Sequence, residues 1–335
     1  MNPLTANLPR IPLAQLPTPI AELKNLRRKL GNCPRLLIKR DDLTGLATGG
    51  NKTRKLEFLI ADALQQGAAT VITVGGAQSN HCRQTVAAAA KHGLRCVLVL
   101  SGAPIPAGQW NGNLLLDDLL GAEIVWAQGQ PRDAVVAQIV EKLQAKGASP
   151  YVIPIGGSNP VGITGYVAAV EELASQLIVQ KEKIDRIVVV SGSGGTHAGV
   201  LVGVKSLRLN ARVEGMNNFA IPDIRARVRD LCRETIEYLH LDILLGDEDF
   251  IFHAACGQHE YGVLTNAERE AIRLLARTEG ILLDPVYTAR AFGQMLAFIR
   301  AGVYAPGETI LFWHTGGTAA LFAYAAELMN QTNIG

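Results

Sequence analysis

Short apolar runs rich in β-branched residues alternate along the chain with longer segments in which apolar residues recur at helical spacing. The apolar runs occupy residues 36–39, 71–74, 96–100, 151–154, 187–190 and 310–313. Amphipathic segments lie between them, among others at 53–66, 83–92 and 133–146. This alternation predicts strands joined by helices, a mostly parallel sheet and right-handed crossovers. We therefore expect an α/β fold, with ligands bound where Gly- and Ser-rich loops leave the carboxyl ends of strands.

Composition narrows the class of protein. The 335 residues suffice for one large or two ordinary domains, and the apolar runs are far too short to span a bilayer. Lys and Arg outnumber Asp and Glu by only 32 to 30, without a basic stripe, so we expect small-molecule partners rather than nucleic acid or membrane. Residues 1–10 lack the features of a secretory signal, and the five cysteines show neither disulfide nor zinc spacing. These features predict a cytoplasmic protein with no metal site.

Lys52 is the first candidate for chemistry. It follows two glycines and precedes a predicted helix in the stretch T-G-G-N-K-T-R-K-L-E, residues 48–57. A lysine near cationic neighbours and out of bulk water has a lowered pKa, as imine chemistry requires. Lys52 is therefore a candidate Schiff-base residue, and a solvated lysine at a helix start is the alternative. The pattern of a nucleotide-binding P-loop is broken because Asn51 stands between Gly50 and Lys52.

A glycine-rich loop follows the apolar run at 187–190 and reads S-G-S-G-G-T-H-A-G, residues 191–199. Exposed N–H groups at a helix N-terminus, with the hydroxyls of Ser193 and Thr196, form a cradle for a phosphate dianion. The loop thus predicts a phosphorylated cofactor. It does not match the dinucleotide pattern, since His197 occupies the third glycine position. A purely structural turn is the alternative.

Two further groups of residues add weaker signals. Ser79 and Asn80 follow a predicted strand, and at a helix start they can hold a substrate carboxylate or act as an ordinary N-cap. Near the C-terminus, Tyr261 and Tyr287 are either packed aromatics or acids and bases with lowered pKa values. The hydroxyl of Thr315, in W-H-T-G-G at 313–317, can face a ring nitrogen.

Taken together, these ordered motifs closely resemble the family of D-cysteine desulfhydrases and aminocyclopropanecarboxylate deaminases. The matching stretches are G-G-N-K-T-R-K-L-E at 49–57, Q-S-N-H at 78–81, G-S-G-G-T at 192–196, D-P-V-Y at 284–287 and H-T-G-G at 314–317. The resemblance implies a tryptophan-synthase-β-like fold (fold type II) with two open-twisted α/β domains. A large cofactor-binding domain would contain residues 1–57 plus 166–335, and a smaller inserted domain residues 58–165. Two chains would form a homodimer.

The resemblance also implies pyridoxal 5'-phosphate as cofactor, held as a Schiff base on Lys52, and it assigns further residues by motif matching. Cofactor contacts are expected from Asn51, Lys52, Lys55, Asn80, Ser193, Gly194, Gly195, Thr196, Thr288 and Thr315. The substrate is expected to face Ser79, Asn80 and His81. Catalysis is expected to depend on Lys52, Ser79, Tyr261 and Tyr287.

The expected reaction rests on two positions at which this chain differs from the deaminases of the family. The deaminase pattern has Tyr-Glu where this chain has Tyr287-Thr288, and Leu where it has Thr315. Without an acidic side chain beside it, the ring nitrogen of the cofactor stays neutral. A neutral ring is a weaker electron sink, but it still suffices when a thiolate leaves from a β-carbon. The resemblance thus implies β-elimination from D-cysteine, giving pyruvate, hydrogen sulfide and ammonia. L-cysteate sulfo-lyase, aminocyclopropanecarboxylate deaminase and a non-catalytic amino-acid binder of the same fold remain alternatives.

Overall fold

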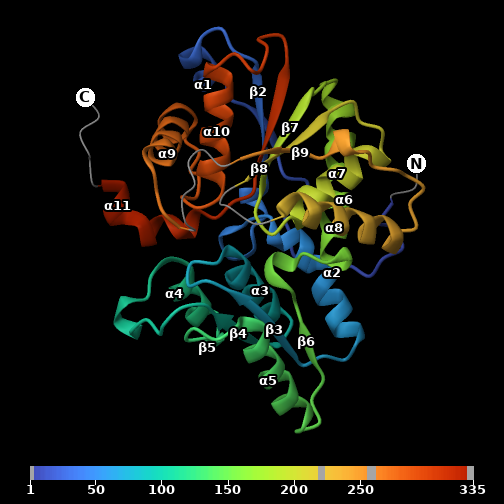
Figure 1. Cartoon of the computed structure of the whole chain (residues 1–335), viewed down its shortest axis with the longest axis vertical. Coiled ribbons are helices and arrows are strands. Elements are labelled where there is room, and N and C mark those ends of the chain that lie inside the picture. Colours follow the sequence, from blue (N-terminus) through green and yellow to red (C-terminus); the bar gives the residue numbers. More distant parts are fainter. Residues whose placement is uncertain (1–3, 218–222, 255–261, 330–335) are drawn as a thin grey trace.

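The computed structural model describes residues 4–217, 223–254 and 262–329, and it contains two open β-sheets (Figure 1). The larger sheet has six strands in the order β1-β2-β10-β7-β8-β9. Its strands are β1 (Ile20–Glu22), β2 (Arg35–Arg40), β7 (Arg186–Ser191), β8 (Arg212–Asn217), β9 (Ile251–His253) and β10 (Thr309–His314). The short β1 pairs antiparallel with β2. The other neighbouring strands of this sheet are parallel.

The smaller sheet has four parallel strands in the order β5-β4-β3-β6. They are β3 (Thr70–Gly75), β4 (Arg95–Leu100), β5 (Glu123–Trp126) and β6 (Pro150–Val152). These strands all fall within 58–165, the segment proposed as the inserted domain, and the strands of the larger sheet fall outside it. The domain limits themselves stay a proposal, because sheet membership does not locate the residue at which a domain begins.

Helices cover both faces of each sheet (Figure 1). One face of the larger sheet packs against α6 (Pro160–Gln180), α7 (Gly195–Ser206) and α8 (Ile224–Tyr238). The other face packs against α1 (Lys24–Leu30), α9 (Asn266–Glu279) and α10 (Thr288–Arg300). The smaller sheet lies between α2 (Lys52–Gln65), α3 (Asn80–Lys91) and α4 (Gly112–Leu119) on one face and α5 (Arg132–Gln144) on the other. The short α11 (Ala325–Met329) follows β10.

Strand β7 shows why the apolar runs were visible in the sequence. Ile187 and Val189 pack with α6, α7 and α8, whereas Val188 and Val190 pack with α9 and α10. Successive side chains of a strand point to opposite faces, and here both faces are buried, so all four positions from 187 to 190 are apolar.

The α/β class and the six predicted strands are confirmed as β2, β3, β4, β6, β7 and β10, and the three predicted helices as α2, α3 and α5. Strands β1, β5, β8 and β9 were not predicted. Two of them have only three residues, and β8 carries the buried Glu214, whose ion pair with Arg186 removes it from the apolar pattern. Among the described residues, no helix is long and apolar enough to cross a membrane.

Candidate active site

A cavity of about 710 Å³ lies where loops from the two sheets meet. Loops that follow β3, β4, β7 and β10 line it, and all of them leave the carboxyl ends of parallel strands, as expected. The sequence-predicted residues among its lining are Asn51, Lys52, Ser79, Asn80, His81, Ser193, Gly194, Thr196, Tyr287 and Thr315. The predicted residues Lys55, Gly195 and Thr288 do not line it. Tyr261 lies outside the described residues.

Lys52 is the first residue of α2, and its Nζ donates a hydrogen bond to Oδ1 of Asn51 at 3.1 Å. Burial lowers the pKa of Lys52 to about 8; the positive charge of Arg83 acts in the same direction, and the negative charge of Asp284 opposes it. A lysine with this pKa carries an appreciable fraction of neutral, nucleophilic amine near neutral pH. The expectation of a lowered lysine pKa is therefore confirmed, with burial as the main cause.

Asn51 joins the lysine loop to two other motifs. Its Nδ2 donates to Oγ1 of Thr196 at 2.9 Å, and its backbone N–H donates to the carbonyl of Thr315 at 3.0 Å. A Cβ at Gly316 would lie 2.6 Å from the Cα of Gly50, so a side chain at this crossing would force the two loops apart. Three motifs that lie far apart in the sequence therefore meet at one place.

A second cluster surrounds the Nζ of Lys55, which donates to the carbonyl of Gly156 at 3.0 Å and to Oγ of Ser158 at 3.4 Å. Ser158 and Ser193 share a hydrogen bond of 2.8 Å between their hydroxyls. A Cβ at Gly195 would lie 2.7 Å from this Nζ and 2.4 Å from Oγ of Ser158. The absence of a side chain there leaves open the space beside a lysine, two hydroxyls and the first turn of α7.

This cluster is suited to an anion. Burial holds the pKa of Lys55 well below its ordinary value, and the positive charges of Lys52 and Arg227 lower it further. Helix α7 begins after Gly194, and no side chain in the described part of the protein caps its first N–H groups, which can therefore bind a ligand. A phosphate would supply the negative charge that Lys55 lacks and would accept hydrogen bonds from the hydroxyls and N–H groups. The residues present thus fit a phosphorylated cofactor.

The start of α3 forms another part of the cavity wall. Ser79 is the N-cap residue, and its Oγ accepts from the N–H of Cys82 at 3.2 Å. Oδ1 of Asn80 accepts from Nδ2 of Asn113 at 2.9 Å, which orients the Asn80 amide. Ser79 is thus an N-cap that also lines the cavity, and its contact with a substrate carboxylate stays a prediction.

His81 lines the cavity in its neutral form. Burial holds its pKa well below the ordinary value, and the charges of Lys52 and Lys55 lower it further. Its Nε2 lies 2.8 Å from Oγ1 of Thr73, and that hydroxyl donates its proton to the carbonyl of Ile153 at 2.8 Å. His81 therefore offers no positive charge to a substrate carboxylate, so any such charge must come from other residues.

Thr288 does not line the cavity, although the family resemblance implied that it contacts the cofactor. Its hydroxyl donates to Oδ1 of Asp284 at 2.7 Å and accepts from the Asp284 backbone N–H at 2.7 Å. These two hydrogen bonds tie the first residue of α10 to the preceding turn, so the Thr288 side chain stabilises the start of the helix. Thr315, by contrast, lines the cavity. Of the two threonines, the structure brings Thr315 together with Lys52.

Several residues of the site escaped sequence reasoning. Ser158 and Gly156 complete the anion cluster, Arg227 lines the cavity and donates to the carbonyl of Ser193 at 2.9 Å, and Asp284 acts on the charge of Lys52. The strand–loop–helix order around I-G-G-S-N-P at 155–160 was a usable signal for Ser158. Arg227 lies in the first turn of α8, and no motif in the neighbouring sequence marks it.

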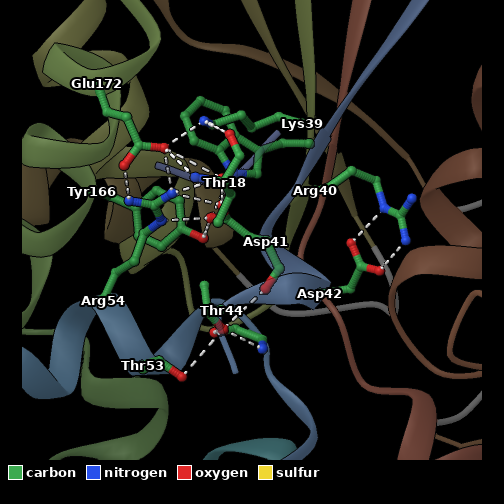
Figure 2. A network of polar contacts seen from close by, with 12 residues as sticks. Thr18, Lys39, Arg40, Asp41, Asp42, Thr44, Thr53, Arg54, Tyr166 and Glu172 are labelled. Atoms are coloured by element: carbon green, nitrogen blue, oxygen red, sulfur yellow. Dashed lines mark hydrogen bonds and ion pairs between the residues drawn. The ribbon is translucent and has the colours of Figure 1, made fainter. Parts of the chain in front are cut away.

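A buried polar network anchors the helix that begins with Lys52 (Figure 2). Its centre is the carboxylate of Asp41, which accepts hydrogen bonds of 2.7–2.9 Å from Thr18, Arg54, Tyr166 and Trp313. Burial acts to raise the pKa of Asp41, but the charge and hydrogen bonds of Arg54 hold it below its ordinary value. Because Arg54 belongs to the first turn of α2, this ionised pair fixes the helix start against β2 and β10.

Glu172 of α6 extends the same network (Figure 2). Its carboxylate accepts hydrogen bonds from both terminal nitrogens of Arg54, at 2.9 and 3.0 Å, and pairs with the fully buried Lys39. Sequence reasoning missed this network, because its members are spread from residue 18 to residue 313.

Comparisons with known proteins identify the family of this chain. The family described as "Pyridoxal-phosphate dependent enzyme" matches residues 11–316. A D-cysteine desulfhydrase of Salmonella paratyphi C is 43% identical over 325 residues, covering 94% of this chain and 96% of the relative. The D-cysteine desulfhydrase of Yersinia enterocolitica is 42% identical over 334 residues, covering 96% and 98%.

Solved structures place the fold. The crystal structure of an "ACC deaminase homologue" superposes with a TM-score of 0.88 at 40% identity over 97% of each chain. The diaminopropionate ammonia lyase of Escherichia coli, at 16% identity and a TM-score of 0.66, shares the fold alone. The expected fold type is thereby confirmed. This chain belongs to the family of pyridoxal-phosphate dependent enzymes.

Proposed function

We propose that this chain acts on D-cysteine with pyridoxal phosphate and water, giving pyruvate, hydrogen sulfide and ammonia. The names of its relatives support this substrate, and one observation about the cavity supports this reaction. Of the described residues that line the cavity, the single carboxylate is Asp133, on helix α5, which packs against the smaller sheet. The wall that carries Lys52, Tyr287 and Thr315 offers hydroxyl groups instead, as a neutral cofactor ring nitrogen requires.

The proposed contacts to the cofactor follow from the two clusters. Lys52 supplies the amine that binds the cofactor aldehyde. Lys55, Ser193, Gly194, Gly195 and Thr196 would hold the phosphate, together with Ser158. When bound, pyridoxal phosphate provides an electron sink that weakens the bond between the substrate's Cα and its proton. Thr315 is proposed to face the ring nitrogen, since Thr288 does not line the cavity.

The remaining residues are proposed to orient the substrate and move protons. The N–H groups at the start of α3 and the hydroxyl of Ser79 would hold the substrate carboxylate, with Asn80 beside it. Nζ of Lys52, in its neutral form, would accept the proton from Cα. Tyr287 would donate a proton to the departing sulfur, which leaves as hydrosulfide.

L-Cysteate is a second candidate substrate, and it is favoured by the charges at the cavity. Arg132 and Arg227 both line it, and a sulfonate on the β-carbon would be attracted by two guanidinium groups. Sulfite would then leave in place of hydrosulfide, and the other products would be the same.

Product analysis distinguishes these activities. The purified enzyme is incubated separately with D-cysteine, L-cysteine, L-cysteate and aminocyclopropanecarboxylate, and sulfide, sulfite, pyruvate and ketobutyrate are measured. We expect sulfide and pyruvate from D-cysteine and little or no ketobutyrate from aminocyclopropanecarboxylate. More efficient release of sulfite from L-cysteate than of sulfide from D-cysteine would replace the proposed activity with the second one.

A cytoplasmic homodimer is part of the same proposal. The cytoplasmic location is supported by Cys33, Cys82, Cys96 and Cys232, which are buried free thiols, as is usual in a reducing compartment. The dimer is supported by the family resemblance. Light scattering on the purified protein would test it, and a mass of one chain would refute it.

A further inference from the structure

The loop before Lys52 has an unusual backbone. Four consecutive residues have positive φ, namely Ala47 (42°), Thr48 (70°), Gly49 (72°) and Gly50 (127°). The first two carry side chains, which disfavour this conformation. A Cβ at Gly49 would lie 2.0 Å from the carbonyl oxygen of Asp42, so this position accepts only glycine. Such a loop keeps its shape only if neighbouring groups hold it.

Arg83 of α3 contacts this loop with its guanidinium group. Its Nη1 donates to the carbonyl of Ala47 and to the hydroxyl of Thr48, and its Nη2 donates to the carbonyl of Gly49 at 3.1 Å. The guanidinium is fully buried, so these bonds do not compete with bulk water. Three of the four positive-φ residues are thus bound by one side chain.

The next residue of α3 holds the other end of the segment. Oε1 of Gln84 accepts from the N–H of Thr53 at 2.8 Å and from its hydroxyl at 3.0 Å, within the first turn of α2. The same helix α3 begins with the residues that line the cavity at 79–81. Helix α3 therefore connects the proposed carboxylate site to the loop that carries Lys52.

The charge of Arg83 has weak local compensation. Its Nε has no hydrogen-bond partner, and neither carboxylate oxygen of the buried Asp117 has one. Burial lowers the pKa of Arg83 to about 10, although the negative charges of Asp117 and Asp284 oppose this. Two charged groups shift the pKa of Lys52: Asp284 raises it and Arg83 lowers it. The charge of Lys52 in turn lowers the pKa values of the buried Lys55 and His81.

We propose that Arg83 is a positioning residue for Lys52: its guanidinium holds residues 47–49 in their positive-φ conformation and so presents the lysine amine to the cavity. This inference rests on the proposed role of Lys52 in binding the cofactor. If the hydrogen bonds of Arg83 served only the fold, their loss would change the stability of the protein and leave the chemistry of Lys52 unaltered. Arg83 is expected to change both.

The test follows cofactor capture by the apoprotein, with pyridoxal phosphate as the probe and the rate of covalent adduct formation recorded as a function of pH. Arg83→Gln removes a positive charge near Lys52, so the midpoint of the pH profile should move upward, and an upward shift of one unit slows capture below the midpoint about tenfold. Arg83→Lys keeps the charge, so its midpoint should stay near that of the wild type. Its capture should still be slow, because an ammonium group cannot reproduce the planar fork of a guanidinium.

Two further variants separate positioning from stability. Arg186→Gln removes another largely buried arginine, at the start of β7, and should lower the melting temperature without changing capture. In the Arg83→Lys background, the double change Ala47→Gly and Thr48→Gly should restore capture, because glycine adopts positive φ without strain. This rescue also decides the matter if Arg83→Gln does not fold.

The inference is overturned if Arg83→Gln captures the cofactor at the wild-type rate and midpoint, or if glycine fails to rescue Arg83→Lys. Lys52→Ala tests the underlying role separately, since it should form no covalent adduct. An adduct in Lys52→Ala would refute the proposed role of Lys52, whatever the Arg83 variants show.

Discussion

Lys52 and Lys55 lie on the same turn of α2 and have different surroundings. Lys52 lines the cavity, and burial lowers its pKa to about 8. Lys55 contacts a carbonyl and a hydroxyl in the anion cluster, where its charge has no acid beside it among the described hydrogen-bond partners. The two side chains are thus suited to different tasks, nucleophilic attack by Lys52 and phosphate binding by Lys55.

The pH dependence of cofactor capture should report the pKa of Lys52. Only the neutral amine attacks an aldehyde, so the capture rate of the apoprotein should rise with pH and level off above about 8, well below the pKa of about 10.4 for an ordinary lysine. Stopped-flow absorbance measures this rate, with Lys52→Ala as the blank. A profile still rising above pH 10 would contradict the lowered pKa.

Ser79→Ala should separate the two roles of Ser79. Loss of the N-cap hydrogen bond should lower the free energy of unfolding by about 1 kcal/mol. If Ser79 also holds the substrate, KM should rise while the cofactor stays bound. Thr265→Ala is the matched control, because Thr265 caps α9 and does not line the cavity. Equal KM effects in both variants would argue against a substrate contact.

Helix α7 contributes its N-terminus to the proposed phosphate site. Its N-terminus follows strand β7 directly, and Gly194 enters the helix with φ of 87°, a conformation that favours glycine. The first turn of α7 lies beside Lys55 and Ser158, which come from other elements, since a Cβ at Gly195 would lie 2.7 Å from Nζ of Lys55 and 2.4 Å from Oγ of Ser158.

Gly195→Ala should weaken cofactor binding. The added Cβ would lie 2.7 Å from Nζ of Lys55 and 2.4 Å from Oγ of Ser158, within the proposed phosphate site. We expect the dissociation constant of pyridoxal phosphate, measured by equilibrium dialysis, to rise at least about tenfold, which corresponds to roughly 1.4 kcal/mol. Gly280→Ala, at a helix end with open space around it, should cost stability and leave this constant unchanged. If folded Gly195→Ala binds pyridoxal phosphate with wild-type affinity, Gly195 is not part of the phosphate site.

Across the whole molecule, the Asp41 network joins β2, α2, α6 and β10 into one support for the cavity (Figure 2). Asp41→Asn would leave the buried Arg54 with Glu172 as its remaining acid. Removing one partner of a buried pair typically costs about 3–5 kcal/mol. We therefore expect a loss of that size in urea unfolding. Glu123→Gln breaks an exposed pair with Arg95 and should cost far less.

The same pair predicts a dependence of stability on pH. Because the folded pKa of Asp41 lies below its unfolded value, its contribution is complete above the unfolded pKa of about 3.9 and is lost as the pH falls through the folded value. Asp41→Asn should accordingly lose less stability than the wild type over this acid range. Parallel losses in both proteins would show that other carboxylates control acid unfolding.

Much of the fold was readable in the sequence, because the strands of a parallel sheet covered on both faces are continuously apolar. Runs such as 187–190 therefore stood out, and so did the loops that follow them, where Lys52, Ser79 and Thr196 were found. Strand β8 was hidden by the buried Glu214, whose partner Arg186 comes from a neighbouring strand. A pairing between strands leaves no periodic trace along either of them.

The order of residues predicted which motifs carry chemistry, since each is a local strand–loop–helix signal. Their assembly depended on the tertiary structure. The bond from Asn51 to Thr196 spans 145 positions, and the bond from Trp313 to Asp41 spans 272. Burial, which lowers the pKa of Lys52 and keeps His81 neutral, likewise arises only when distant segments pack together. Local sequence encodes the turn before a functional side chain, whereas the charge that the side chain carries is set by neighbours that only folding supplies.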